Sequence, residues 1–169
     1  TSALVDLGFL DKPRVSFLKR PVESYPLYSE VRQAVLPDWK QDPRRLQKLG
    51  AKLFDETERR GIVENDARNR LLLSVAYRRA QNRERVLILC HTIPHSIRLC
   101  NLWDRSLAET GAAALSRWRV DGKTDSASLD RTFRDFRQAP GGLLIATPFM
   151  REGIDIPEID ALILAGGGA

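Results

Sequence analysis

The sequence is poor in several residue types whose scarcity limits its function. Its 169 residues include two cysteines, two histidines and one methionine, and aromatic residues make up 7%. Two cysteines do not supply the disulfide framework that small secreted domains need. No apolar run approaches the roughly 20 residues of a membrane span, and no basic-then-apolar leader indicates secretion. We expect no membrane partner and a cytoplasmic or nucleoid-associated protein.

The few cysteines and histidines also give no sign of a metal site. Cys90 lies in an apolar run and Cys100 on one face of an expected helix, as is typical of small core residues in a reducing compartment. His91 and His95 are close in sequence, but the spacing matches no standard zinc site. We expect no bound metal.

The composition is that of one folded domain. Hydrophobic residues make up 43% and charged residues 29% of the chain, and the length suits a single sizeable core. The net charge of +5 is concentrated in residues 41–85, which hold 12 Lys and Arg against 7 Asp and Glu, whereas the other residues hold 15 of each. This segment is either a contact surface for a polyanion or a solvated helical face.

Short apolar runs alternate with helical patterns. We expect strands at 14–19, 86–90, 112–120, 143–146 and 161–165, and helices at 42–60, 65–80, 94–111 and 126–138. Gly61 should end the first helix, and Ile97 should be buried in the third. Continuous apolar strands joined by helices predict an α/β fold with a mainly parallel sheet and helices on both faces.

Polar residues follow three of these expected strands. They are Thr92, the segment Gly122–Thr124, and Thr147. Ligands of open α/β sheets bind outside the carboxyl ends of the strands, so we expect these residues along one edge, where they can hold phosphates. Thr92 has a second interpretation as the N-cap of the following helix, and the two roles are compatible.

The triplet Gly122-Lys123-Thr124 is not the end of a Walker A loop. That loop requires a glycine five residues before the Gly-Lys pair, and Arg117 stands there. There is also no run of small residues to form a cradle of amides.

The most specific pattern spans residues 147–157, which read TPFMREGIDIP. It resembles motif V of superfamily 2 helicases, T-x5-G-x-D-x-P, in the second RecA-like lobe. Glu152 stands where DEAD-box RNA helicases carry an arginine, and the form Arg151–Pro157 is closer to that of DNA-directed members. Two shorter segments support the resemblance: residues 87–92 are similar to motif IV, and Asp121-Gly122 to the His-Gly segment of such lobes.

The resemblance implies a RecA-like three-layer lobe and a role for each matched residue. Thr92, Gly122, Lys123, Thr124 and Thr147 would contact the nucleic-acid backbone. Gly153 and Asp155 would face the neighbouring lobe and couple nucleotide state to grip on the strand; Asp155 has an alternative interpretation as a turn residue.

By the same resemblance, ATP and Mg²⁺ would be bound mainly by a first RecA-like lobe of the same protein. No Walker A loop and no Asp-Glu pair for magnesium occur here, and motif VI would follow Gly168. We therefore expect no catalytic residue in this chain and negligible ATP hydrolysis by it alone.

The resulting hypothesis divides the chain into a lead-in segment from the first lobe, residues 1–13, and a helicase C-terminal domain, residues 14–169. The function would be that of the second motor lobe of an ATP-dependent DNA helicase or translocase. Its partner would be single-stranded or branched DNA, with RNA less favoured. Two alternatives stay open: a catalytically inactive RecA-like binding lobe, and an unrelated doubly wound enzyme acting on a phosphorylated metabolite.

Overall fold

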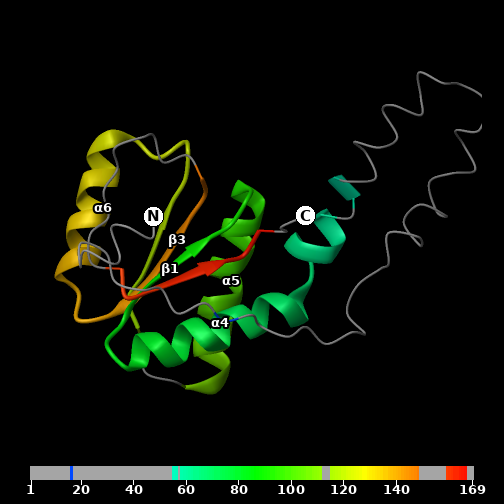
Figure 1. Cartoon of the computed structure of the whole chain (residues 1–169), viewed down its shortest axis with the longest axis horizontal. Helices are drawn as coiled ribbons and strands as arrows, with labels where there is room; N and C mark the ends of the chain where they lie inside the picture. The colour runs from blue at the N-terminus through cyan, green and yellow to red at the C-terminus, as the bar shows by residue number, and fades with distance from the viewer. Residues whose placement is uncertain (1–15, 17–54, 57, 112–114, 149–158, 167–169) are drawn as a thin grey trace, which may run out of the picture.

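The computed structural model describes residue 16 and residues 55–56, 58–111, 115–148 and 159–166, in which helices and strands alternate (Figure 1). In chain order the elements are the π-helix η3 (Arg59–Val63), the helix α4 (Asp66–Gln81), the strand β1 (Arg85–Leu89), the helix α5 (Ile93–Thr110), the strand β2 (Arg117–Val120), the helix α6 (Ser126–Gln138) and the strands β3 (Gly142–Ala146) and β4 (Ala161–Leu164). The strand expected at 14–19, apart from residue 16, and the helix expected up to residue 54 lie outside these residues.

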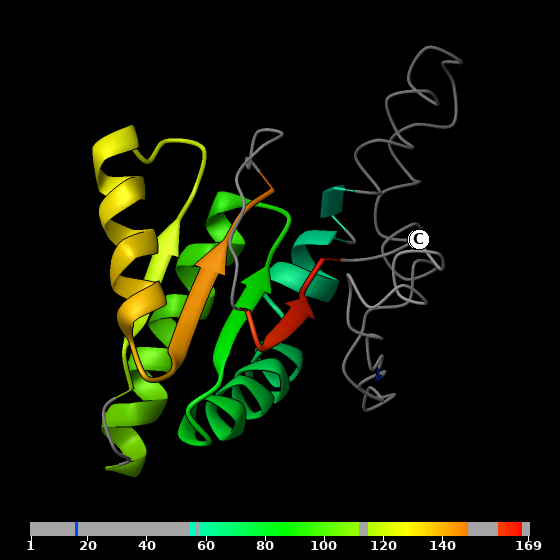
Figure 2. The same cartoon turned by 60° about the vertical axis from the view of Figure 1, so that its left-hand side comes forward.

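The described strands form a four-stranded sheet in the order β2-β3-β1-β4, and every neighbouring pair is parallel. Leu89 pairs with Ala146 on one side and with Leu164 on the other, and Val120 also pairs with Ala146. All four strands therefore end at the same level, and their arrows point to one edge (Figure 2).

Helices cover both faces of the sheet. On one face, residues of α4 and α5 pack with inward side chains of β1, β3 and β4; on the other, Phe133 and Phe136 of α6 pack on Leu87, Val120 and Leu144. All five residues of β3 are buried, as expected for a strand with a helix layer on each side. This arrangement confirms the predicted three-layer α/β fold. Among the described residues, no helix is both long and apolar enough to cross a bilayer.

Local signals in the sequence set most of the helix ends. Asn65 caps α4 by accepting a hydrogen bond from the amide of Arg68 at 3.0 Å, as predicted. The helix α5 ends at Gly111, whose φ of 59° is a left-handed conformation that glycine adopts without strain. The bounds of α6 are those predicted, with Asp125 as its N-cap.

The predicted helix end at Gly61 was wrong. The chain continues through Gly61 in the π-turn η3, where the amide of Glu64 donates to the carbonyl of Arg59 at 2.8 Å. Gly61 is buried, and η3 contacts both α4 and α5. The unfavourable helix propensity of glycine, about 1 kcal/mol, is outweighed here by tertiary packing.

The predicted burial of Ile97 was also wrong, since its side chain is 44% exposed. The inward positions at this end of α5 belong to His95 and Ser96, both fully buried, followed by Leu99 and Cys100. Because two polar residues occupy the inner face of α5, its buried side lies away from Ile97, the apolar residue that the pattern had placed inside.

His95 joins three elements through a buried polar contact. Its Nε2 lies 3.0 Å from Oδ1 of Asn69 in α4, and the side-chain Nδ2 of Asn69 donates to the carbonyl of Val63 in η3 at 3.0 Å. Burial, together with the positive charges of Arg68 and Arg98, lowers the pKa of His95 to about 4. The imidazole is therefore neutral at pH 7, with Nε2–H as the donor to Asn69.

Replacing His95 with glutamine should flatten the pH dependence of stability. An unfolded histidine titrates near pH 6.5, whereas the folded pKa is about 4, so the unfolded state binds a proton first as the pH falls. The free energy of unfolding should thus decrease by on the order of 2–3 kcal/mol between pH about 6.5 and about 4. In His95→Gln this component should be absent.

Urea unfolding at a series of pH values measures both profiles. His91→Gln is the matched control for the loss of one histidine, because His91 is exposed. A His95→Gln profile parallel to that of the unchanged chain would contradict the assignment.

Candidate functional site

The predicted site residues that the structure describes lie at the carboxyl edge of the sheet. The backbone pairing continues one residue beyond β1, where the amide of Cys90 donates to the carbonyl of Ala146 at 2.9 Å. Thr147 directly follows Ala146, Thr92 comes two residues after Cys90, and the segment Gly122–Thr124 follows β2. The structure thus brings the ends of these strands and the residues after them to one edge, as the sequence predicted.

Thr92 is the N-cap of α5. Its Oγ1 accepts a hydrogen bond from the amide of His95 at 3.3 Å, and its carbonyl accepts one from Ser96 at 3.1 Å. The capping interpretation is therefore confirmed. Because Oγ1 acts as an acceptor within the chain, the hydroxyl hydrogen of this half-buried side chain remains able to donate to a ligand. The N-terminal end of α5 adds a partial positive charge beside it.

Asp121 holds the segment Gly122–Thr124 in a tight loop. Its carboxylate accepts a hydrogen bond from the amide of Lys123 at 2.8 Å, and its amide donates to Oγ1 of Thr124 at 3.0 Å. The amide of Thr124 in turn donates to the carbonyl of Asp121 at 2.9 Å. The amides of Lys123 and Thr124 are therefore used inside the loop, and the loop does not form the amide cradle of a Walker A motif. It presents the Lys123 ammonium and the Thr124 hydroxyl instead.

The carboxylate of Asp121 is ionised although its side chain is only 5% exposed. Burial by itself would raise the pKa of Asp121, but the hydrogen bond from the Lys123 amide and the guanidinium of Arg119 outweigh it, so the pKa is lowered. Sequence reasoning treated Asp121 as a replacement for histidine and did not single out Arg119. Arg119 stands two residues before Asp121, on the same side of the extended chain, but its contact with Ser96 in α5 has no signal in the sequence.

Thr147 is placed at the same edge but is largely covered. Its side chain is 5% exposed, and its amide donates to the carbonyl of Val120 at 3.3 Å. Thr147 therefore lies just below the surface of this edge and exposes little of itself to a ligand. Gly153 and Asp155 lie outside the described residues, in the segment between β3 and β4.

The described residues offer no reactive thiol and no metal site at this edge. Burial raises the pKa of the Cys90 thiol to about 12, and burial also raises the pKa of Cys100, so both thiols stay protonated at pH 7. The part of the chain that the structure describes contains no group of three or more His, Cys, Asp or Glu side chains arranged to hold a metal ion.

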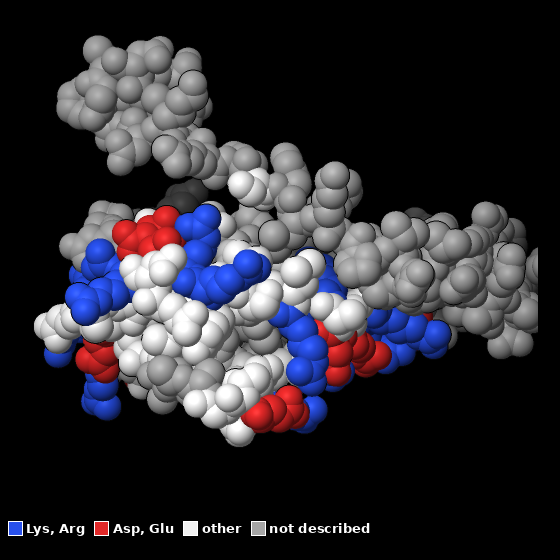
Figure 3. All heavy atoms as spheres, turned by 90° about the horizontal axis from the view of Figure 1, so that it is seen from below, with Lys and Arg blue, Asp and Glu red and all other residues white. Residues whose placement is uncertain are grey.

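The basic excess of residues 41–85 is largely neutralised where it is described. Five arginines form ion pairs, namely Arg59 with Glu56 and Glu64, Arg60 with Glu56, Arg70 with Glu109, Arg79 with Glu84 and Arg85 with Asp160. Basic and acidic side chains also lie close together on the face shown in Figure 3. These contacts favour a solvated helical face over a continuous polyanion footprint for this part of the segment.

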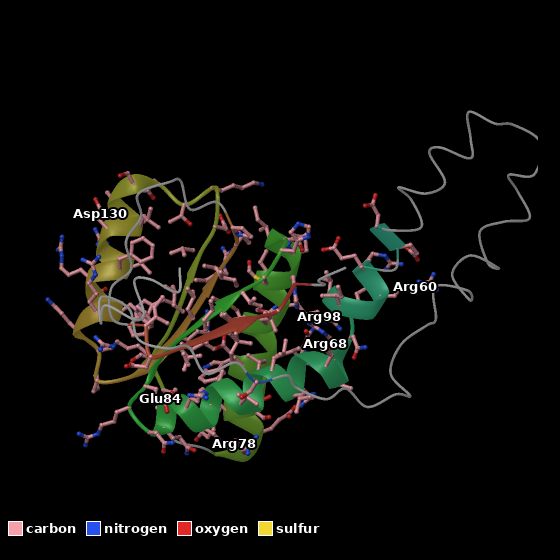
Figure 4. The ribbon with its side chains drawn as sticks, viewed as in Figure 1. Arg60, Arg68, Arg78, Glu84, Arg98 and Asp130 are labelled. Carbon is pink, nitrogen blue, oxygen red and sulfur yellow. The ribbon has the colours of Figure 1, made fainter. Side chains whose placement is uncertain are left out.

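Two other arginines lie closer to the candidate site. Arg68 and Arg98 are beside the carboxyl ends of β1 and β4, whereas Arg78 and Glu84 mark the far end of α4 (Figure 4). Arg68 donates to the carbonyl of Ala165 at 2.8 Å, and so ties α4 to the end of β4. Arg98 is paired with the carboxylate of Asp66, at 2.8 Å, so its charge is also largely neutralised within the chain.

The described residues form a parallel α/β lobe with a helix N-terminus and polar loops along one edge of its sheet, and in open α/β folds this is the edge at which ligands bind. The family described as "Helicase conserved C-terminal domain" matches residues 67–167. The chain therefore belongs to the helicase conserved C-terminal domain family. The match includes all predicted site residues, from Thr92 to Asp155, and confirms the resemblance to the second lobe of superfamily 2 helicases.

The chain is also similar to individual proteins over part of their length. The protein irc3 of Schizosaccharomyces pombe, named as an ATP-dependent helicase, is 31% identical over 83 residues, which are 49% of this chain and 12% of that protein. The ATP-dependent RNA helicase HAS1 of Saccharomyces cerevisiae is 23% identical over 172 residues, 95% of this chain and 32% of that protein. The helicase domain of Hef from Pyrococcus furiosus has 17% identity and a TM-score of 0.48, covering 82% of this chain and 28% of that one. The chain spans a third or less of these proteins.

Substitutions at Thr92 should separate capping from other roles. Thr92→Ala removes the oxygen that accepts from the amide of His95, and it should lower the free energy of unfolding by about 1 kcal/mol. Thr92→Asn keeps a capping oxygen and should leave stability within about 0.5 kcal/mol of the unchanged chain. Urea unfolding measures both, and an alanine variant as stable as the asparagine variant would contradict the cap.

Proposed function

We propose that this chain is the second motor lobe of an ATP-dependent DNA helicase or translocase, and that the carboxyl edge of its sheet grips the nucleic-acid backbone. The observation that carries the proposal is the convergence at this edge of the α5 N-terminus, capped by Thr92, and the loop that presents Lys123 and Thr124. A helix N-terminus, hydroxyl donors and an ammonium group are together complementary to phosphate oxygens.

Contacts of this kind position a strand without reading its sequence. Thr92 and Thr124 use their oxygens as acceptors within the chain, so each has a hydroxyl hydrogen to offer a phosphate. Lys123 adds a charge that draws a polyanion to the edge. A lobe that holds phosphates only can move along a strand of any sequence, which suits a motor.

The preference for DNA over RNA rests on one segment. The form of Arg151–Pro157 resembles DNA-directed members of the superfamily, and this favours DNA. HAS1 is named as an RNA helicase, so the proposal is to be tested with DNA and RNA strands of the same sequence.

The nucleotide is assigned mainly to another part of the protein. The loop Gly122–Thr124 forms no amide cradle, and the described residues contain no group of three or more His, Cys, Asp or Glu side chains arranged for a metal ion. By the resemblance to superfamily 2 helicases, ATP and Mg²⁺ would be held by a first RecA-like lobe. When bound there, ATP supplies the free energy of hydrolysis for movement. Gly153 and Asp155 are proposed to face that lobe and to couple its nucleotide state to the grip at the carboxyl edge.

The 169-residue chain should bind a labelled single-stranded DNA in a strongly salt-dependent way, as measured by fluorescence anisotropy. Lys123→Gln should weaken binding and should lower the slope of log K against log salt by about 0.7, because one phosphate contact to a single strand is lost. The matched control is Arg78→Gln, which removes a charge at the far end of α4 (Figure 4).

Equal slopes for Lys123→Gln and the unchanged chain would rule out Lys123 as a phosphate contact. Tighter binding of the RNA strand than of the DNA strand would contradict the preference for DNA. The proposed contact with the nucleic-acid backbone would still hold.

The chain by itself should hydrolyse ATP at a negligible rate. The amides of Lys123 and Thr124 are committed to Asp121, so the loop with the Gly-Lys-Thr triplet provides no cradle for the triphosphate. Release of inorganic phosphate measures the rate. ATP hydrolysis that survives repurification and disappears in Lys123→Gln would contradict this prediction. It would also show that Gly122-Lys123-Thr124 acts as a phosphate-binding loop.

A further inference from the structure

Two arginines of the edge strand β2 lie against α5 and differ in where they meet it. Arg117 donates from Nε and Nη2 to the carboxylate of Asp104, at 3.0 and 2.8 Å, far from the candidate site. Arg119, two residues nearer to the carboxyl edge, donates from Nη1 to Oγ of Ser96 at 3.3 Å and also to the carboxylate of Asp121. The strand thus carries one structural arginine and a second that reaches the candidate site.

The contacts of Arg119 complete a continuous path between the loop and the helix. At one end the amide of Lys123 donates to Asp121, whose other carboxylate oxygen accepts from Arg119. At the other end, Ser96 accepts from Arg119 and donates its hydroxyl hydrogen to the carbonyl of Ile93, in the first turn of α5, at 2.8 Å. The two elements proposed to hold phosphates are therefore joined through one guanidinium.

We propose that Arg119 is a positioning residue, which fixes the loop Gly122–Thr124 relative to the N-terminus of α5 so that both elements hold phosphates of one strand at the same time. The inference rests on the proposed function, because it concerns the geometry of that same grip. Elements held in the bound arrangement before the strand arrives lose less freedom on binding, and this increases affinity.

The charge of Arg119 has a second effect. Asp121 lies between the two elements, and an unneutralised carboxylate there would repel a phosphate backbone. The guanidinium pairs with this carboxylate, so the pair presents little net charge to the strand. The same nitrogen serves both Asp121 and Ser96, and this commitment within the chain is the reason to assign Arg119 a positioning role and not a phosphate contact.

The test compares Arg119→Met with Arg117→Met in the 169-residue chain. Both substitutions remove a guanidinium that ties β2 to its surroundings, but only the first breaks the path to the loop. Arg119→Met should weaken binding of single-stranded DNA about three- to tenfold. The slope of log K against log salt should fall by much less than the 0.7 of a lost phosphate contact, because the unpaired Asp121 carboxylate repels the strand without touching it. Arg117→Met should bind as the unchanged chain does.

A double substitution separates positioning from direct contact. If Arg119 acts through Ser96, the variant Arg119→Met/Ser96→Ala should bind no more weakly than Arg119→Met alone. Two results together would show a direct phosphate contact and overturn the inference. One is a double variant whose loss of affinity is the product of the losses of the two single variants, and the other is a slope lowered by about 0.7 in Arg119→Met. Affinity equal to that of the unchanged chain would overturn it as well.

Two further results are decisive. Thermal unfolding shows whether Arg119→Met folds. If it does not, Ser96→Ala is used instead, because it removes one end of the path, and it should weaken binding about two- to fivefold. Full affinity in Ser96→Ala would overturn the inference. If the unchanged chain binds no strand at low salt, both the proposed function and this inference are wrong. If the unchanged chain binds but Arg119→Met binds equally well, only the inference is wrong.

Discussion

The parallel pairing of β1 with β3 and β4, and of β3 with β2, determines where the described candidate residues lie. Leu89 pairs with Ala146 and with Leu164, so the strands end level and the residues that follow them meet at one edge. A shift of one residue in a strand would turn its buried side chains to the opposite layer. In β3, whose residues are all buried, such a shift would exchange the contacts of both helix layers at once. The core thus fixes the geometry of the site.

The two ends of α5 are held by different kinds of contact. Towards its C-terminus, Leu99 and Trp103 pack in the apolar core, whereas at its N-terminus His95 and Ser96 make hydrogen bonds to α4 and to β2. Hydrogen bonds depend on direction more strongly than apolar contacts do. The N-terminus of α5 is therefore fixed in orientation as well as in position, and this is the end at which Thr92 faces the proposed ligand.

The sequence predicted the features that have local signals. The four described strands, the bounds of α6 and the caps Asn65 and Thr92 follow from apolar runs and from residues next to the helix ends. The strand predicted at 112–120 was too long, because β2 begins at Arg117 and residues 115–116 are not part of it. The misplaced burial of Ile97 arose because a periodic pattern assigns apolar residues to the inside, and His95 takes that place through a contact with a distant helix. The role of Arg119 depends on side chains from three separate segments, which one sequence does not bring together. Gly153 and Asp155 were identified by motif resemblance alone.

The two cysteines can show how often the interior of the folded chain opens. Cys90 and Cys100 are the only two thiols in the sequence; they are 0% and 6% exposed, and burial keeps both protonated. A modifying reagent requires an accessible thiolate, so each thiol should react when the layer formed by α4 and α5 separates from the sheet. The labelling rate of the native chain would then measure how often this interior opens, without any introduced probe.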